Sequence, residues 1–137
     1  FEYRFVFSSR FLVNSPDSII EYAISLESVL YGHEDWIYTV RFEPRKLDGR
    51  QPLTLISASM DKTMVVWTYD EENAVWIDVA RAGDIGGTTL GFYGATFDQT
   101  GEFVLAHGYQ GALHLWRRDL KSVNLNLNLA FFILKEK

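Results

Sequence analysis

Residues 55–67, LISASMDKTMVVW, decide the fold that this sequence predicts. Two β-rich runs flank a short turn at 60–62, and the second run contains Trp67. β-branched and apolar residues on both sides of such a turn are typical of an antiparallel β-hairpin. A Gly-His pair, Gly32-His33, stands before the strand that precedes this hairpin. The segment therefore predicts three consecutive antiparallel strands that begin after the Gly-His pair.

These elements resemble one WD40 repeat, which has a period of about 40 to 45 residues and contributes four strands to a β-propeller blade. In that family a loop His bonds to the Asp of a tight turn and to a strand Ser or Thr, which in turn bonds the indole N–H of a Trp. The residues that match this structural relay are His33, Asp61, Ser57 or Ser59, and Trp67. Each link satisfies a buried polar group whose loss costs about 1 to 3 kcal/mol. The resemblance implies a binding scaffold rather than an enzyme.

An enzyme remains the alternative from another class, because Ser, His and Asp also form hydrolase triads. The spacing matches the structural relay instead, and the sequence has no nucleophile-elbow motif. A catalytic pocket around a perturbed His33 or His107 would favour a hydrolase. His107 and His114 lack a third ligand for a metal, and the glycines of 83–94 precede a strand rather than a phosphate-binding helix. We therefore expect no catalytic residue, cofactor or metal site.

Composition predicts a globular β protein. The 137 residues are 47% hydrophobic and 15% aromatic. A chain of this length has room for about two blades, but a closed propeller needs about four or more, so we expect it to be part of a longer protein. The net charge of −5 and the lack of a basic block disfavour autonomous binding of RNA or DNA. The absence of cysteine excludes a disulfide scaffold, and no apolar run or leader pattern indicates a membrane segment. We expect a soluble chain.

The predicted fold is all-β, a WD40 propeller fragment of about two four-stranded blades with extra strands at both ends. Residues 1–18 form a variable strand and loop excursion, 19–118 form the two blades, and 119–137 form a tail without a match. The first blade is intact, and its predicted strands are an outermost strand at 19–30, an innermost strand at 36–42, and strands at 53–59 and 63–69. The predicted strands of the second repeat are an outer strand at 75–82, an inner strand at 90–97, and strands at 103–108 and 112–117.

The second repeat is degenerate. When Trp67 is matched with Trp116, Gln110 takes the place of Asp61, and matching the preceding inner strands puts Thr88 in the place of His33. The second blade therefore lacks the relay, and we expect packing against its neighbours to stabilise it.

Four strings narrow the resemblance: LESVLYGHEDWIYTV (26–40), the hairpin string 55–67, TLGFYG (89–94) and AHGYQGALHLW (106–116). Together they resemble the family of the second, propeller subunit of the Elongator complex. That family implies two complete propellers in one long chain. It also implies a non-catalytic adaptor that bridges two other subunits: a large scaffold subunit, and a catalytic subunit that has an acetyltransferase domain and an iron–sulfur cluster. It thereby supports modification of the wobble uridine of transfer RNA, which it contacts only indirectly. The resemblance implies a cytoplasmic location and allows a nuclear one, and a generic WD40 adaptor of another complex is the alternative.

The tail departs from the family. Val123, Leu125, Leu127 and Leu129 alternate with asparagines, and an apolar run follows. Such an alternation can form an outer strand whose apolar end covers an exposed edge. A truncated or misjoined gene product explains the tail equally well.

Strand order places the expected partner contacts on two rims. Successive connections of an antiparallel meander alternate between the ends of the sheet, so the His33 loop and the Asp61 turn share one end, the first rim. Its candidate contacts are Glu34, Asp35, Trp36, Met60, Lys62, Thr88, Thr89, Tyr109 and Gln110. The opposite end is the second rim, with candidates Arg45, Lys46 and Arg50. The sequence leaves open which rim is used.

Overall fold

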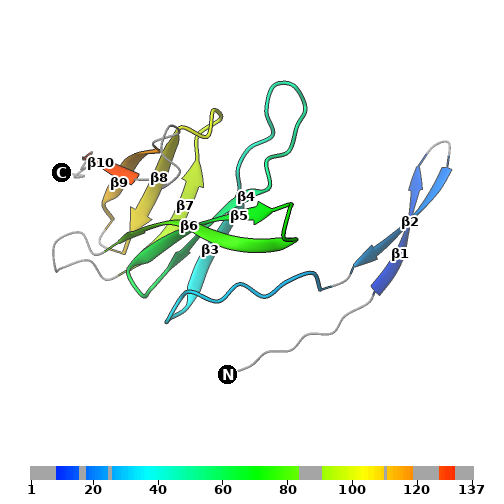
Figure 1. Ribbon diagram of the computed structural model, residues 1–137, viewed down its shortest axis with the longest axis horizontal. Coiled ribbons are helices and arrows are strands. Elements are labelled where there is room, and N and C mark those ends of the chain that lie inside the picture. The colour runs from blue at the N-terminus through cyan, green and yellow to red at the C-terminus, as the bar shows by residue number, and fades with distance from the viewer. Residues whose placement is uncertain are drawn as a thin grey trace. The chain divides into compact units, whose positions relative to one another are not determined.

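The computed structural model describes residues 9–15, 18–24, 26–83, 91–109, 111–118 and 127–131, and the side chains of 26–83, 91–109 and 111–118. Every regular element in these ranges is a β-strand (Figure 1). The described residues contain no helix long and apolar enough to cross a membrane. The chain divides into two units, residues 1–31 and residues 32–137.

The first unit contains one hairpin. Strand β1 (Ser9–Ser15) pairs antiparallel with β2 (Ser18–Ile24), with Ser15 opposite Ser18. The sequence between these two residues is Pro16-Asp17, which are typical turn residues.

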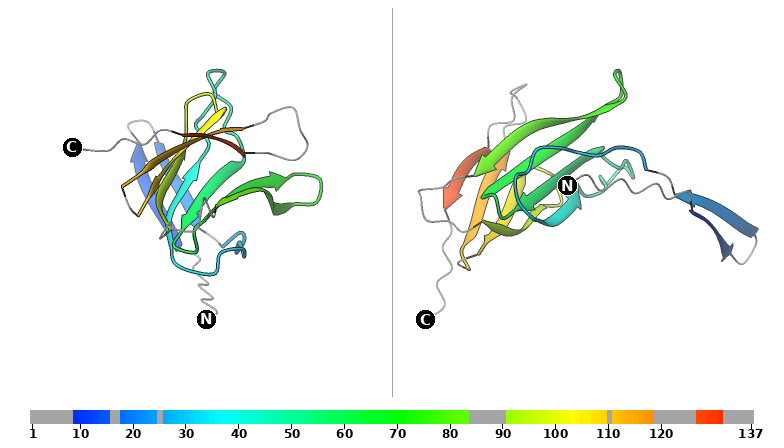
Figure 2. Two further views of the ribbon diagram at one scale, coloured as in Figure 1. Left: turned by 90° about the vertical axis from the view of Figure 1, so that its left-hand side faces the viewer. Right: turned by 90° about the horizontal axis from the view of Figure 1, so that it is seen from below.

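The second unit consists of two four-stranded antiparallel sheets, which lie side by side in both views of Figure 2. The strands of the first sheet, in spatial order, are β3 (Ile37–Phe42), β4 (Thr54–Ser59), β5 (Thr63–Asp70) and β6 (Val75–Gly83). Those of the second are β7 (Phe92–Phe97), β8 (Phe103–Gly108), β9 (Leu113–Arg118) and β10 (Leu127–Phe131). The predicted fold class, an all-β propeller fragment with two four-stranded blades, is confirmed.

The outer strand of the first sheet differs from the one we expected. Residues 19–30 were predicted as the outermost strand, but the strand there ends at Ile24 and pairs with β1. Strand β6 instead occupies the edge beside β5, so the prediction of residues 75–82 as the outer strand of the second repeat is wrong. The reason is a tight turn: Asp70 Oδ1 accepts the amide N–H of Glu72 at 3.0 Å, and Ala74 has a φ of 53°, so the chain folds straight back onto β5.

The outer strand of the second sheet comes from the tail. β10 pairs with β9, with Leu127 opposite Arg118 and Phe131 opposite His114. The expectation that the alternating tail can form an outer strand is therefore confirmed for residues 127–131, and the earlier part of the alternation lies outside the described residues.

The core lies between the two sheets. One face of the first sheet contributes Ile56, Met64 and Val66, and the facing side of the second contributes Phe92 and Val104, all at most 1% exposed. A β-carbon on Gly91, which has a φ of 107°, would lie 2.7 Å from Met60 Cα, so only glycine permits this approach of the two sheets.

The inner strands of the two sheets share one irregularity. The register shifts between Ile37 and Thr39 in β3 and between Phe92 and Gly94 in β7. These positions match when Phe42 is aligned with Phe97. The equivalent position of this bulge in both inner strands agrees with the predicted repeat of one structural unit.

The opposite face of the first sheet is buried at its centre, where Ser57, Val65 and Trp67 lie, and is open along β3. On this face Val40 stands opposite Ser57, and Phe42 stands opposite Leu55. The side chains of Val40 and Phe42 are 51% and 56% exposed. The ring of Phe42 lies edge-on to Trp76, with a centroid separation of 6.3 Å. Adjacent blades cover such faces in a closed propeller.

We predict that the isolated chain self-associates through this open face, because a contiguous apolar surface of that kind favours association. Replacing Val40 and Phe42 together by threonine should shift the chain toward monomer in sedimentation velocity. Ile77→Thr is the matched control, because Ile77 is exposed on the other face of the sheet from Trp76. A compact, monodisperse parent monomer with strong amide protection throughout would contradict the prediction.

Candidate functional site

The relay region joins the loop before β3 to the β4–β5 hairpin. His33 Nδ1 lies 2.8 Å from Asp61 Oδ2, and His33 Nε2 lies 2.7 Å from Ser57 Oγ. Trp67 Nε1 donates a hydrogen bond to the same Ser57 oxygen at 2.9 Å. With the ring proton of His33 on Nδ1, the chain of donors runs from Trp67 through Ser57 and His33 to Asp61, and each member of the chain is satisfied.

Ser57 and Ser59 have different roles, which the sequence left open. Ser57 makes the link between His33 and Trp67. Ser59 Oγ instead donates to the carbonyl of Asp35 at 3.1 Å and accepts the amide N–H of Asp61 at 3.1 Å. Ser59 therefore ties the turn to the loop beside the relay rather than within it.

Thr63 is a further member that sequence reasoning missed. Its hydroxyl donates to Asp61 Oδ1 at 2.7 Å and lies 3.1 Å from His33 Nδ1, while its amide donates to the same carboxylate oxygen at 2.8 Å. A threonine two residues after a turn aspartate is the local signal for such a bond. It completes the set of groups around the Asp61 carboxylate.

Burial and hydrogen bonding act in opposite directions on Asp61. Its side chain is 7% exposed, and desolvation alone would raise its pKa. Hydrogen bonds from the Thr63 hydroxyl, the Glu34 amide, His33 and the Thr63 amide outweigh that effect and lower the pKa of Asp61 to about 2. Asp61 therefore stays ionised throughout the neutral range.

Gly32 is required by the packing of Trp67. A β-carbon at Gly32 would lie 2.8 Å from Trp67 Cη2, closer than carbon atoms approach. The carbonyl of Gly32 accepts a hydrogen bond from Arg81 Nη1 at 2.8 Å, which ties the loop to β6. In the Gly-His pair, Gly32 thus allows the close packing of Trp67 and His33 supplies the relay hydrogen bonds.

The relay is unsuited to hydrolysis. Ser57 is 3% exposed, and its oxygen already contacts the indole N–H of Trp67 and the ring of His33. A nucleophile must reach a substrate carbonyl, which a buried hydroxyl in this position cannot do. The Ser-His-Asp arrangement therefore acts as a structural brace.

In the second sheet, aromatic packing occupies the region of the relay. Ala106 stands where Ser57 stands in the first sheet, and His114 takes the place of Val65. The His114 ring lies edge-on to Phe92 at 6.0 Å and tilted against Trp116 at 5.5 Å, and burial lowers its pKa. Thr88 and Gln110, which match His33 and Asp61, lie outside the described residues.

His107 and His114 do not form a metal pair. Ala106 stands opposite His114, so His107, the next residue, points to the other face of the sheet. No group of three potential metal-ligating side chains occurs in the described part of the chain.

The first rim presents exposed side chains around the relay. Glu34, Asp35, Trp36, Lys62 and Tyr109 are exposed, and Met60 is half-buried. The Met60 amide donates to the carbonyl of Trp36 at 3.0 Å, which brings the loop and the turn together. Thr88, Thr89 and Gln110 lie outside the described residues, so their predicted contacts stay predictions.

A tyrosine cluster on the first rim was missed from the sequence. The ring of Tyr93 lies 4.9 Å from Tyr38 and 5.2 Å from Tyr109, between centroids. Thr39 Oγ1 donates to the carbonyl of Tyr93 at 2.8 Å and joins the two inner strands. The three tyrosines come from separate segments of the chain, and no local sequence pattern predicts that their rings are in contact.

The three second-rim candidates have different environments. Lys46 Nζ donates to Glu43 Oε1 at 2.6 Å and to the carbonyl of Thr100 at 2.7 Å, so its charge is used within the molecule. Arg50 pairs with Asp48 at 3.2 Å in an exposed ion pair, and Arg45 is exposed. Arg45 and Arg50 are therefore the cations of this loop that face solvent.

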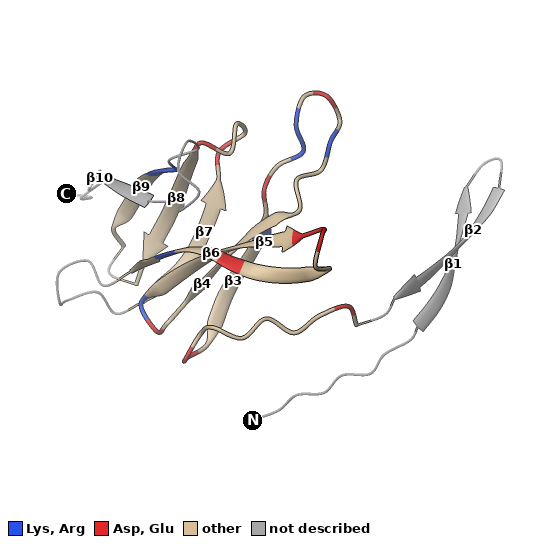
Figure 3. Ribbon diagram, viewed as in Figure 1, with Lys and Arg blue, Asp and Glu red and all other residues tan. Residues whose placement is uncertain are grey.

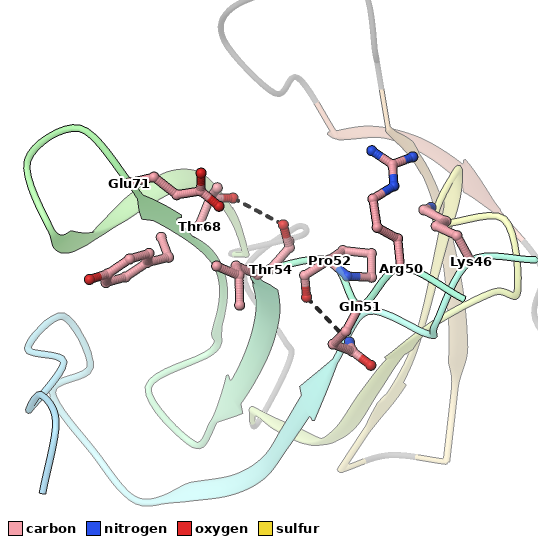
Figure 4. A pocket seen from close by; sticks show the side chains of 9 residues that line it. Lys46, Arg50, Gln51, Pro52, Thr54, Thr68 and Glu71 are labelled. Carbon is pink, nitrogen blue, oxygen red and sulfur yellow. Dashed lines mark hydrogen bonds between the residues drawn. The ribbon is translucent and has the colours of Figure 1, made fainter. Parts of the chain in front are cut away.

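A pocket of about 330 Å³ lies beside this loop (Figure 4). Lys46 and Arg50 line one side, and Thr68 and Glu71 line the other. Thr54 and Thr68 hydroxyls lie 3.3 Å apart within it. Its nine lining residues form a mixed polar and apolar surface, and the ammonium of Lys46 is already bonded to Glu43 and Thr100.

The repeated sheets, the shared bulge and the relay define a WD40-type propeller protein. No protein-family model matches the chain. Three relatives named Elongator complex protein 2 align with it: the zebrafish (Danio rerio) protein at 47% identity over 72% of this chain, the human (Homo sapiens) protein at 46% over 81%, and the Arabidopsis thaliana protein at 48% over 70%. The chain belongs, as a partial sequence, to the Elongator complex protein 2 family. It spans only 12%, 14% and 12% of the lengths of these three relatives.

We predict that His33→Ala and Asp61→Ala each lower the free energy of unfolding by about 1 to 3 kcal/mol, because each leaves buried polar groups without partners. Lys62→Ala is the matched control, since Lys62 is the exposed neighbour in the same turn and should change stability little. Denaturant titration measures the three variants. Relay variants as stable as the parent would contradict the bracing role.

The low pKa of Asp61 predicts acid sensitivity. Because that pKa is about 2 in the folded chain and 3.8 in the unfolded reference, the stability from ionised Asp61 is present above about pH 4 and is lost as the pH falls toward 2. We expect a loss of about 1 to 2 kcal/mol relative to Asp61→Asn between pH 5 and pH 2. Parallel pH profiles of parent and Asp61→Asn in urea titrations would refute this.

Proposed function

We propose that this chain is part of a non-catalytic scaffold subunit of the Elongator complex. In this proposal the subunit bridges the catalytic acetyltransferase and iron–sulfur subunit and the large scaffold subunit. It thereby supports modification of the wobble uridine of transfer RNA, which it contacts only indirectly. The observation that carries the proposal is the similarity to proteins named Elongator complex protein 2, including 46% identity over 81% of the chain to the human protein.

The geometry of the site supports a scaffold role. The Ser-His-Asp group is buried and internally satisfied, whereas the exposed side chains gather at the two rims. Rims built on rigid sheets suit the binding of other proteins, because the frame holds the contacting loops in place. The second candidate function is a WD40 adaptor of a different complex, which the same fold would serve.

Purification of the tagged chain from cells that also produce the two other subunits tests the proposal. We expect both subunits to copurify with the parent chain and to be lost from the Asp61→Ala chain to the extent that it unfolds. Copurification of neither subunit, together with a stable unrelated partner, would favour the adaptor of another complex. Imaging of the tagged protein tests the proposed cytoplasmic location and shows whether it also enters the nucleus.

We further predict that the purified chain binds transfer RNA no better than the non-specific range of about 10⁻⁴ to 10⁻⁶ M. The chain carries a net charge of −5, and phosphate binding requires several adjacent cations. Titration with labelled transfer RNA at two salt concentrations measures this. Tight binding that resists salt would make the chain a direct reader of RNA and overturn the indirect role.

A further inference from the structure

Residues 43–53 form an ordered loop between β3 and β4, which reaches beyond the ends of the strands (Figure 1). The Lys46 amide donates to the carbonyl of Arg50 at 2.8 Å, and the Gly49 amide donates to the carbonyl of Lys46 at 2.9 Å. Gly49 has a φ of 84°, which glycine tolerates and which lets the tip turn back. At the base, Gln51 Nε2 donates to the carbonyl of Glu43 at 2.8 Å. The loop is therefore closed by its own backbone.

A buried carboxylate anchors this loop to the second sheet. The side chain of Glu43 is only 5% exposed and accepts hydrogen bonds from Lys46 Nζ at 2.6 Å and from Arg118 Nη1 at 2.8 Å. Arg118 comes from β9, 75 residues further along the chain. A β-carbon on Gly101, which has a φ of 78°, would overlap Glu43 Oε1, so the turn before β8 fits directly over the carboxylate.

Two more bonds hold the loop to the turn at 98–101. Lys46 Nζ donates to the carbonyl of Thr100 at 2.7 Å, and Gln99 Nε2 donates to the carbonyl of Arg45 at 3.2 Å. Buried ion pairs add little net stability but fix geometry. This set of contacts, here called the Glu43 anchor, fixes where the loop tip stands.

The tip that the anchor holds presents an apolar side chain between two cations. Leu47 is fully exposed, and Arg45 and Arg50 are exposed on either side of it in sequence. Figure 3 shows basic and acidic segments alternating along this loop, and Asp48 is the acidic residue of the tip. A leucine that is ordered and yet wholly in water gains most from a partner, because the loop needs no further ordering to bind.

We propose that the loop tip, residues 45–50, is a protein-docking site whose partner presents an apolar pocket for Leu47 bordered by carboxylates for Arg45 and Arg50. This inference rests on the proposed scaffold function and assigns one surface to it. Guanidinium groups pair with carboxylates through two parallel hydrogen bonds, which gives both attraction and orientation. A nucleic acid suits the tip less well, because its phosphates gain nothing from Leu47 and are repelled by Asp48.

The test measures binding of the purified full chain to each of the two Elongator subunits, separately, by surface-based kinetics. Leu47→Ser and the double variant Arg45→Glu with Arg50→Glu should each weaken binding to one subunit by at least about tenfold. The double variant should also slow association more at low salt than at high salt. Ile77→Ser is the matched control for the leucine, and Arg41→Glu, at an exposed cation of β3 outside the loop tip, is the control for charge; both should bind within about twofold of the parent.

Glu43→Gln provides a second line of evidence. This change keeps the shape of the side chain and removes the charge that holds Lys46 and Arg118. We expect faster hydrogen exchange at the Lys46 and Gly49 amides and binding weaker than that of the parent, even though residues 45–50 are unchanged. Unaltered exchange and unaltered binding in Glu43→Gln would overturn the role of the anchor.

The remaining outcomes separate the two proposals. If the parent binds a subunit and the Leu47 and arginine variants bind as tightly, the docking site is wrong and the scaffold function stands. If neither subunit binds the parent, the proposed function fails and the assigned partner fails with it. If charge reversal weakens only the binding of transfer RNA, the tip is a nucleic-acid contact and the proposal is overturned.

Discussion

The hydrogen bonds around the Asp61 carboxylate are the constraint on which the first sheet depends. One charged group accepts from His33, from Thr63 and from the amide of Glu34, and so it joins the loop before β3 to the β4–β5 turn. His33 extends the chain to Ser57, and Ser57 extends it to Trp67. Because each member satisfies the next, loss of one exposes the polar atoms of its neighbours to an apolar surrounding. The cost of a change is therefore larger than the net value of one bond.

The second sheet shows that the same fold tolerates another solution. Aromatic contacts among Phe92, His114 and Trp116 fill the space between sheets, and Ala106 replaces the serine of the relay. Packing of this kind depends on neighbours on both sides, whereas a relay is complete within one sheet. The first sheet can thus order its own loops, and the second takes part of its order from the contact with the first. The shared bulge in β3 and β7 remains because it serves the inner strand in both.

Local sequence patterns predicted most of the strands, but they did not predict contacts between residues that are far apart in the sequence. The strands of 53–69 and of 103–117 follow from alternation and turn residues, and the relay was implied by the resemblance to a WD40 repeat. The outer strand was misassigned because an alternating run such as 19–30 shows its own type but not the edge that it joins. Glu43 was missed for a related reason: its partner Arg118 lies 75 residues away, and a lone glutamate after a strand carries no sign of burial. The tyrosine cluster of Tyr38, Tyr93 and Tyr109 likewise exists only in three dimensions.

The two rims are ordered by different electrostatic means, and this difference separates their possible roles. On the first rim the charge of Asp61 is directed inward to backbone and ring donors, and the exposed groups around it are aromatic and acidic side chains together with Lys62. On the second rim the buried charge of Glu43 is neutralised by Lys46 and Arg118, which leaves Arg45 and Arg50 outside the anchor. A sequence count treats Arg45, Lys46 and Arg50 as one basic cluster, but the structure divides it into one internal and two external cations. The internal cation fixes the loop, so the docking site that we propose offers a partner two guanidinium groups rather than a broad positive surface.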